Sequence, residues 1–194
     1  GSEMCIRDSS KEAISELGKM GVKKTVMLTG DKEPIAADMA KKAGINEYYA
    51  KLLPQEKVEK VKALQQGTDD IVLYTGDGIN DAPVLAQSDV GVAMGGIGSD
   101  VAIEAADVVI MSDSLSKLPV ARKIAKKTMN IVHENIIFSI AVKVLIIIGC
   151  AIGIFNENAM WLAVFGDVGV CLIAVANALR AMHVSKKVKK NNTL

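Results

Sequence analysis

Hydrophobic residues follow two different patterns in the two halves of this chain. Over residues 23–110, short runs rich in β-branched side chains alternate with stretches in which apolar side chains recur every three or four positions. The first pattern is typical of buried strands and the second of amphipathic helices. Such an alternation predicts an α/β fold in which helices cover both faces of a parallel sheet. We expect strands at residues 24–28, 47–50, 71–74, 89–92 and 107–110, and helices at 33–43, 54–66, 82–87 and 99–105.

Glycine and proline fit the expected boundaries of these elements. Gly44 stands where the C-terminal cap of the 33–43 helix belongs, and Pro54 opens the next helix. In a parallel sheet, ligands bind outside the carboxyl ends of the strands. Two polar loops, at residues 29–31 and 75–81, fall at that edge of the sheet.

Two long apolar runs follow, at residues 131–155 and 159–180. Each run reaches the roughly 20 residues that are needed to cross a bilayer. Basic residues flank the outer ends of the pair, whereas the connecting loop has no Lys or Arg. The positive-inside rule then predicts a transmembrane hairpin with both ends in the cytoplasm. Two buried helices of a soluble protein are the alternative.

These patterns divide the chain into parts. We expect an aqueous domain over residues 10–113, a basic connecting helix over 114–130, the hairpin, and a basic cytoplasmic tail over 181–194. Residues 1–9 show no helical or strand period, and we interpret them as a non-native leader, with a natural disordered leader as the alternative.

The composition narrows the classes of function. Half of the 194 residues are hydrophobic, the formal net charge is +1, and aromatic residues make up 4%. Neither a nucleic-acid-binding surface nor a disordered chain is therefore indicated. The three cysteines are not spaced as in zinc fingers or disulfide frameworks, and reduced thiols fit a protein that faces the cytoplasm.

Residues 75–81, Thr-Gly-Asp-Gly-Ile-Asn-Asp, form an acidic, glycine-rich loop after an expected strand. Asp77 and Asp81 stand four residues apart, and hard oxygen ligands this close can hold Mg²⁺, which binds through one or two carboxylates plus a phosphate. Gly76 and Gly78 permit a tight backbone and the close approach of a phosphoryl group. Taken alone, Gly-Asp-Gly is also a common turn.

A second loop at a strand end, Thr29-Gly30-Asp31, offers a hydroxyl and backbone N–H groups to phosphate oxygens. Lys57, just inside the helix that Pro54 opens, can bring a positive charge to a phosphate. Each feature also has an ordinary interpretation, as a simple turn and as a solvated helix lysine.

The order of these motifs resembles that of a known family. Thr-Gly-Asp, then Pro-x-x-Lys, then Gly-Asp-Gly-x-Asn-Asp is similar to the haloacid-dehalogenase-like phosphotransferase core, and more closely to the phosphorylation domain of P-type ATPases. The long motif reads TGDGINDAPVL at 75–85, followed by GVAMG at 91–95, DVA at 100–102 and ADVV at 106–109. The resemblance covers about residues 11–194.

The resemblance implies roles for individual residues. Asp77 and Asp81 would hold Mg²⁺, Thr29 and Lys57 would stabilise the phosphoryl group transferred from ATP, and Asn80 would help to set the loop. Lys32 departs from the family, which often has Asn after Thr-Gly-Asp.

The sequence also lacks parts of that family. Its aspartate nucleophile lies in an Asp-Lys-Thr-Gly-type motif, which is absent here, as are its nucleotide-binding and actuator domains. We therefore expect a C-terminal fragment that is inactive alone and whose partners are the remainder of the same ATPase chain and the lipid bilayer.

Lys143 and Asp167 are ionisable residues inside the apolar runs. Such groups are costly within a membrane and mark functional sites. Both lie roughly 14–18 Å from the connecting loop at ~1.5 Å per residue, so an antiparallel hairpin can pair them. A purely structural salt bridge is the alternative.

Helical spacing predicts that these two residues belong to a shared inner face of the hairpin. Gly166 and Gly169 would allow close helix approach beside Asp167. Cys150 and Cys171 fit small core hydrophobes better than metal ligands. The predicted face consists of Asn135, Ser139, Lys143 and Cys150 on the first span, and of Asp167 and Cys171 on the second.

The last two spans resemble those of the zinc, cadmium and lead exporters among heavy-metal P-type ATPases. The chain reads Asn135…Lys143 in the first span, and WLAV at 161–164, Asp167 and ANALR at 176–180 in the second. The resemblance implies that Asp167 binds the transported cation and that Lys143 is its counter-charge. Carboxylate suits a divalent ion better than Cu⁺.

We therefore expect part of a multi-pass pump of the plasma membrane that exports Zn²⁺, Cd²⁺ or Pb²⁺. A copper-type pump, a membrane-anchored phosphatase of the same fold and a non-catalytic regulator remain the alternatives.

Overall fold

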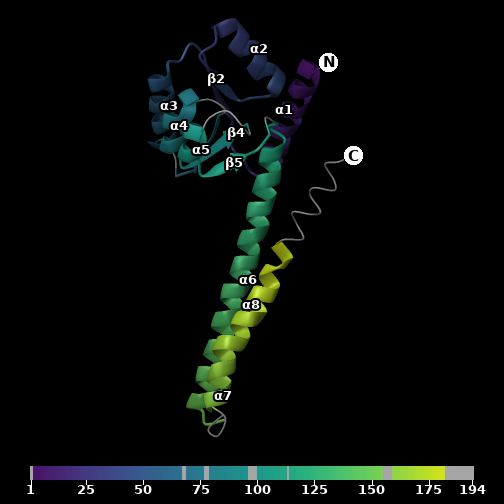
Figure 1. The fold of residues 1–194 in the computed structure, drawn as a ribbon, viewed down its shortest axis with the longest axis vertical. Helices are drawn as coiled ribbons and strands as arrows, with labels where there is room; N and C mark the ends of the chain where they lie inside the picture. Colours follow the sequence, from purple (N-terminus) through teal and green to yellow (C-terminus); the bar gives the residue numbers. More distant parts are fainter. Residues whose placement is uncertain are drawn as a thin grey trace. The chain divides into compact units, whose positions relative to one another are not determined.

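The computed structural model describes residues 2–66, 69–76, 79–95, 100–112, 114–154 and 159–181. The chain forms two compact units, one ending at Pro119 and the other beginning at Val120 (Figure 1). The first unit holds the strands and short helices, and the second holds two long apolar helices.

The first unit alternates strands and helices as the hydrophobic pattern predicts. The predicted helices at 33–43, 54–66 and 82–87 have the observed bounds, and the strands are shorter than or shifted from the expected ranges. The elements are α1 (Ser2–Lys19), β1 (Val26–Leu28), α2 (Glu33–Ala43), β2 (Glu47–Tyr49), α3 (Pro54–Gln66), β3 (Leu73–Gly76), the 3₁₀ turn η1 (Ile79–Asp81), α4 (Ala82–Gln87), β4 (Val90–Met94), α5 (Asp100–Ala105) and β5 (Val108–Ile110).

Strand β3 begins two residues later than its apolar run predicts. The N–H of Val72 donates to the carboxylate of Asp89 at 2.7 Å, and Asp89 N–H donates to the Val72 carbonyl at 3.1 Å. The ladder with β4 therefore starts at the next residue, where Leu73 pairs with Val90.

Helix α1 extends over residues in which the sequence shows no helical period, and their origin as a non-native leader stays a prediction. Residues 1–9 lack an amphipathic period, yet the backbone is helical from Ser2. Ala13 and Leu17 of the same helix are buried. Once packing fixes those turns, each further residue adds a hydrogen bond at low cost, so the helix extends without a periodic pattern of its own.

All pairings between described strands are parallel, as predicted, but the strands form two sheets. Strand β1 pairs with β2, and the second sheet has the order β3-β4-β5. Within the described residues, β1 and β3 each pair on one side alone, so each presents an open edge.

Helices cover both faces of the second sheet. On one face, Val92 packs with Leu17 of α1, and on the other, its neighbour Ala93 packs with Leu85 of α4 and Ala102 of α5. Successive residues of a strand point to opposite faces, so β4 lies at the centre of both cores. Gly91 lets α4 approach closely, since a Cβ there would lie 2.6 Å from the Leu85 carbonyl oxygen.

The described residues of the second unit form two antiparallel helical segments (Figure 1). Helix α6 runs over Lys117–Ala151, so the expected connecting helix and first span are continuous. The second segment is α7 (Ala159–Val164), η2 (Phe165–Gly169) and α8 (Val170–Ala178), and η2 is a π-helical turn that the hydrophobic pattern does not predict. Two helices, Lys117–Ala151 and Met160–Ala178, are long and apolar enough to cross a membrane.

Candidate functional site

The loop after β1 is held by its own side chains and by the segment after β2. Thr29 Oγ1 donates to the Asp31 carboxylate at 2.9 Å and accepts from the Asp31 N–H at 3.1 Å. The N–H groups of Lys51 and Leu52 donate to the carbonyls of Asp31 and Thr29. Gly30 is exposed at the tip, where a Cβ would make only an ordinary 3.5 Å contact. These hydrogen bonds therefore preorganise the loop at the carboxyl end of β1.

The start of α3 at Pro54 places Lys57 in the first turn of the helix, close to Asp81. The Glu56 carboxylate accepts the N–H of Leu53 at 2.7 Å, which is half of a capping box at the helix start. One residue later, Lys57 Nζ lies 2.9 Å from Asp81 Oδ1. Their side chains are only 17% and 13% exposed, so solvent screens this ion pair far less than a surface pair.

Asp81 closes the turn η1 and folds back over β3. A Cβ at Gly76 would lie 2.9 Å from both Cβ and Oδ2 of Asp81, so only glycine leaves room for the carboxylate. Next to it, Thr75 Oγ1 is buried and has no hydrogen-bond partner among the described residues. Such an orphaned polar atom calls for a ligand or water.

The predicted site residues fall into two groups. Thr29 is joined to Asp31, and Lys57 to Asp81, whereas no hydrogen bond or ion pair links the two groups within the described part of the chain. Asn80 lies exposed in η1. Asp77 and Gly78 lie outside the described residues. The oxygen of Asp81 and the orphaned hydroxyl suit a hard cation such as Mg²⁺.

Beside the first sheet, three side chains shift one another's titration. Lys24 pairs with Glu47, and the Tyr49 hydroxyl donates to the same carboxylate. The Lys24 hydrogen bond, followed by that of Tyr49, lowers the pKa of Glu47. In turn, the hydrogen bond that Lys24 makes with Glu47 raises the pKa of Lys24, and the one that Tyr49 makes with Glu47 raises the pKa of Tyr49.

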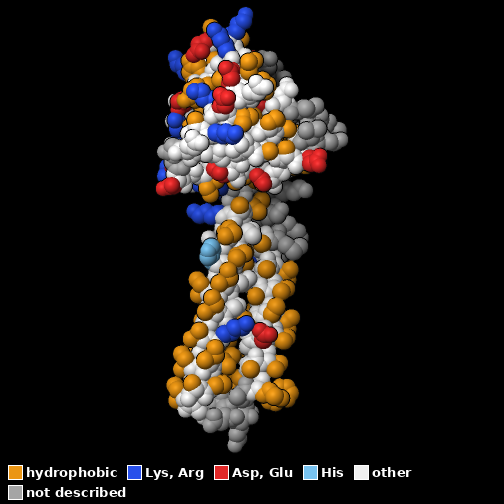
Figure 2. All heavy atoms as spheres, turned by 90° about the vertical axis from the view of Figure 1, so that its left-hand side faces the viewer, with side chains coloured by type: hydrophobic (Ala, Val, Ile, Leu, Met, Phe, Trp, Pro, Cys, Tyr) orange, Lys and Arg blue, Asp and Glu red, His pale blue; other side chains and the backbone are white. Residues whose placement is uncertain are grey.

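The second unit brings the two predicted membrane charges together. Lys143 Nζ donates to Asp167 Oδ1 at 3.1 Å, as the predicted depths require. In Figure 2, a basic and an acidic side chain meet on a flank of this unit where hydrophobic side chains predominate. Asp167 lies at the middle of the π-helical turn η2, and such turns often occur at functional sites.

The predicted shared face is wrong in part. Asn135, Ser139 and Cys150 are half-buried, but the side chains of Lys143 and Asp167 are 55% and 76% exposed. Cys171 is exposed as well. Two small residues of the second segment, Gly166 and Ala174, lie against α6 instead, because small side chains let helix backbones approach closely. The ion pair therefore lies on a flank of the hairpin. The buried and half-buried residues of the second segment are Leu162, Gly166, Gly169, Val170, Ala174, Asn177 and Ala181.

Gly166 shows how closely the helices approach. It is buried, and a Cβ there would lie 2.5 Å from Ile146 Cδ1 of α6. The predicted role of Gly166 in close approach is confirmed. The neighbouring Gly169 instead makes room within its own helix, for the ring of Phe165 at 2.9 Å.

One group of polar residues was not predicted as a unit. Glu134 and Asn135 of α6 contact Asn177 and Arg180 of the second segment. The sequence signal that could have predicted this group is the occurrence of polar residues near the same end of both apolar runs. Over the described residues, no group of three or more His, Cys, Asp or Glu side chains gathers as a complete metal site.

Comparisons with known proteins agree with this architecture. A haloacid dehalogenase-like hydrolase family matches residues 2–89. A cadmium, zinc and cobalt-transporting ATPase of Bacillus subtilis is 48% identical over 94% of this chain and 26% of its own length. A zinc-transporting ATPase of Synechocystis is 48% identical over 90% of the chain and 24% of its own length.

A solved structure extends the match to both units. The crystal structure of a zinc-transporting PIB-type ATPase in the E2.Pi state gives a TM-score of 0.78 at 38% identity, covering 88% of this chain and 27% of its own. The chain thus spans about a quarter of the length of the relatives that it matches. A haloacid-dehalogenase-like unit joined to two membrane-length helices, with such relatives, places this chain in the family of heavy-metal P-type ATPases.

Proposed function

We propose that this chain is part of an ATP-driven pump that exports divalent heavy-metal cations, Zn²⁺, Cd²⁺ or Pb²⁺, through an aspartyl-phosphate cycle. The observation that carries the proposal is the 3.1 Å contact between Lys143 and Asp167 within two membrane-length apolar helices. Relatives named as cadmium- and zinc-transporting ATPases support it. A carboxylate in that position suits a divalent cation.

In the aqueous unit, the described side chains are suited to phosphoryl transfer. Asp81, with Asp77, would hold Mg²⁺, which supplies positive charge to the phosphate oxygens when bound. Lys57 holds Asp81 in place and brings its own charge to the same edge of the sheet. The Thr29–Asp31 loop offers backbone N–H groups, with Gly30 leaving the approach open, and Asn80 shapes the turn that carries Asp81.

The open edges of β1 and β3 support a longer protein. In the described part of the chain, β1 and β3 each pair on one side alone, and the two predicted phosphate loops follow these two strands at their carboxyl ends. We propose that a strand from another part of the same pump pairs with both and presents the aspartate that is phosphorylated. The two loops would then flank that aspartate at the carboxyl ends of their strands.

In the membrane unit, the two charges offset one another. Without a cation, the Lys143 ammonium neutralises Asp167 and lowers the cost of holding a carboxylate at membrane depth. A divalent cation that binds Asp167 displaces the ammonium, which stays close and favours release of the cation. Because both side chains face a flank of the hairpin, the remaining ligands would come from other helices of the pump packed on that flank. Both ends of the hairpin would be cytoplasmic.

Metal-stimulated ATPase activity of the full-length protein in lipid tests this function. Zn²⁺, Cd²⁺, Pb²⁺, Co²⁺ and Cu⁺ are compared in parallel on the parent, on Asp167→Ala and on Ser139→Ala, a half-buried control on α6. We expect stimulation by Zn²⁺, Cd²⁺ or Pb²⁺ that only Asp167→Ala abolishes. Stimulation by Cu⁺ alone, or equal activity in Asp167→Ala, would contradict the proposal.

A further inference from the structure

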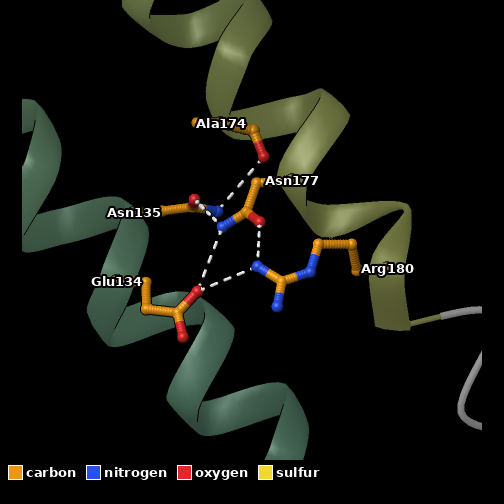
Figure 3. A network of polar contacts seen from close by, with 5 residues as sticks. All are labelled: Glu134, Asn135, Ala174, Asn177 and Arg180. Atoms are coloured by element: carbon orange, nitrogen blue, oxygen red, sulfur yellow. Dashed lines mark hydrogen bonds and ion pairs between the residues drawn. The ribbon is translucent and has the colours of Figure 1, made fainter.

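Four polar side chains tie the two apolar helices together near one end of the hairpin (Figure 3). Asn177 is the centre of this network. Its Nδ2 donates to Asn135 Oδ1 at 2.8 Å and, at 3.5 Å, to Glu134 Oε2. Its Oδ1 accepts from Arg180 at 2.7 Å, and Arg180 also contacts Glu134 at 3.2 Å.

The order of donors and acceptors in the network is fixed by chemistry. A guanidinium can only donate, so the side-chain oxygen of Asn177 must face Arg180 and its NH₂ group must face α6. Asn135 then presents its oxygen to Asn177 and donates with its own NH₂ group to the carbonyl of Ala174 at 3.1 Å. Aspartate has the shape of asparagine but no such donors when ionised, so the network requires an amide at position 177.

The same network sets a register between the helices. Ile146 stands eleven positions after Asn135 on α6, and Asn177 stands eleven positions after Gly166 on the other segment. The polar contact and the glycine contact therefore belong to one antiparallel alignment, and Lys143 and Asp167 lie between its two ends.

Apolar helix surfaces specify such an alignment poorly in a bilayer. Lipid tails are as apolar as Leu or Ile, so burial gives little preference for one register over another. Buried asparagines do specify register, because a slipped pair leaves its amides without partners. A slip of one helical turn would shift the helices by ~5.4 Å, which is more than the 3.1 Å between Lys143 Nζ and Asp167 Oδ1.

We propose that Asn135 and Asn177 form a positioning clamp that sets the register of the hairpin and so places Asp167 against Lys143. The clamp touches neither charge. Its effect on cation binding rests on the proposed function of Asp167, whereas its effect on register does not. Glu134 and Arg180 hold the Asn177 amide in the orientation that the clamp needs.

Disulfide trapping in membranes tests the register without any transport assay. In the full-length protein, with its other cysteines replaced by serine, Lys143→Cys and Asp167→Cys are introduced together and the rate of cross-linking is measured. Asn177→Ala and Asn135→Ala should each slow it about threefold, the factor that a typical interhelical hydrogen bond represents. Asn177→Asp should slow it more, and Ser139→Ala should leave it unchanged. Rates equal to the parent in Asn177→Ala and Asn135→Ala would overturn the proposal.

Equilibrium binding of Zn²⁺ to the otherwise native full-length protein tests the link to Asp167. We expect Asn177→Ala to weaken binding about threefold when Asp167 is present and to have no further effect in Asp167→Ala. Equal weakening in both backgrounds would make Asn177 a general structural residue and overturn its positioning role. If Asp167→Ala alone leaves Zn²⁺ binding unchanged, the proposed function fails, while the cross-linking result still decides the register.

Discussion

Asp81 occupies the space that a side chain at Gly76 would need. Its Oδ2 lies 2.9 Å from the ideal Cβ position of Gly76, while Oδ1 of the same carboxylate accepts from Lys57 at 2.9 Å. The glycine of the strand, the aspartate of the turn and the lysine of α3 therefore form one packed arrangement. A methyl group added to the glycine would push the carboxylate from its place without changing any charge.

Gly76→Ala should therefore impair phosphoryl transfer in the full-length protein. Displacing a charged hydrogen bond costs about 1.5–3 kcal/mol, so we expect roughly a tenfold or greater loss of phosphoenzyme formation. Gly18→Ala in α1 is the control, because a Cβ at position 18 would meet nothing within 4 Å and the residue lies outside the proposed site. Phosphorylation from labelled ATP measures both variants, and equal losses would show that the Gly76 contact is unimportant.

The spacing of the helices beside Asp167 should depend on two residues together. Gly166→Ala places a Cβ 2.5 Å from Ile146 Cδ1, which is the far end of a flexible side chain. Because a flexible side chain can move aside, we expect a cost near the lower end of the ~1–3 kcal/mol that overpacking causes, and a modestly lower melting temperature in detergent. Ile146→Val removes that terminal methyl group and should restore most of the loss in the double variant. If the double variant is no more stable than Gly166→Ala, the helices do not meet at this point.

The helices and the loop motifs were predictable from sequence because local signals agree there. Pro54, with Glu56 supplying the capping carboxylate, marks the start of α3, and Gly44 adopts the left-handed conformation at φ 73° that its cap position requires. The Lys143–Asp167 contact was predictable because two charges in apolar runs have few other partners.

Other features depend on contacts between distant residues. The face that the hairpin buries is set by where glycines let the helices meet, so Lys143 and Asp167 lie beside it although their spacing suggested otherwise. The π-helical turn around Asp167 leaves no mark in hydrophobic periodicity. The division of the strands into two sheets depends on which strand lies next to which, and periodicity does not encode that order.

The stability of the first unit should depend on pH in part through Glu47 and Lys24. Because the pKa of Glu47 is lowered in the folded chain, its ion pair adds to the free energy of unfolding above the ordinary carboxyl pKa. This contribution is lost as the pH falls through the lowered value. The raised pKa of Lys24 means that its contribution is present below the ordinary ammonium pKa and is lost as the pH rises through the raised value. Around neutral pH the pair contributes constantly.

Carboxyl ¹³C NMR of the detergent-solubilised chain measures this effect directly. Glu47→Gln assigns the signal, and its midpoint in the parent should lie below that of an ordinary glutamate. Lys24→Met removes the hydrogen bond that lowers the pKa of Glu47 most, so the titration midpoint of Glu47 should rise. The hydrogen bond from the Tyr49 hydroxyl should still keep this midpoint below that of an ordinary glutamate. A midpoint that does not move in Lys24→Met would rule out the ion pair in solution.

Lys143 should affect cation affinity and turnover in opposite directions. In the proposed mechanism its ammonium competes with the cation for Asp167 and then favours release. Lys143→Ala should therefore bind Zn²⁺ more tightly yet show a lower maximal rate of Zn²⁺-stimulated ATP hydrolysis. Each change should be at least about threefold, since a hydrogen bond between charged groups is worth more than the average interhelical one.

Lys143→Arg keeps the charge but changes the geometry, so its affinity and its rate should fall between those of the parent and Lys143→Ala. Equilibrium dialysis and ATPase assays on the full-length protein in lipid separate the two effects. A loss of both affinity and rate in Lys143→Ala would instead mean that the lysine only supports the fold around Asp167.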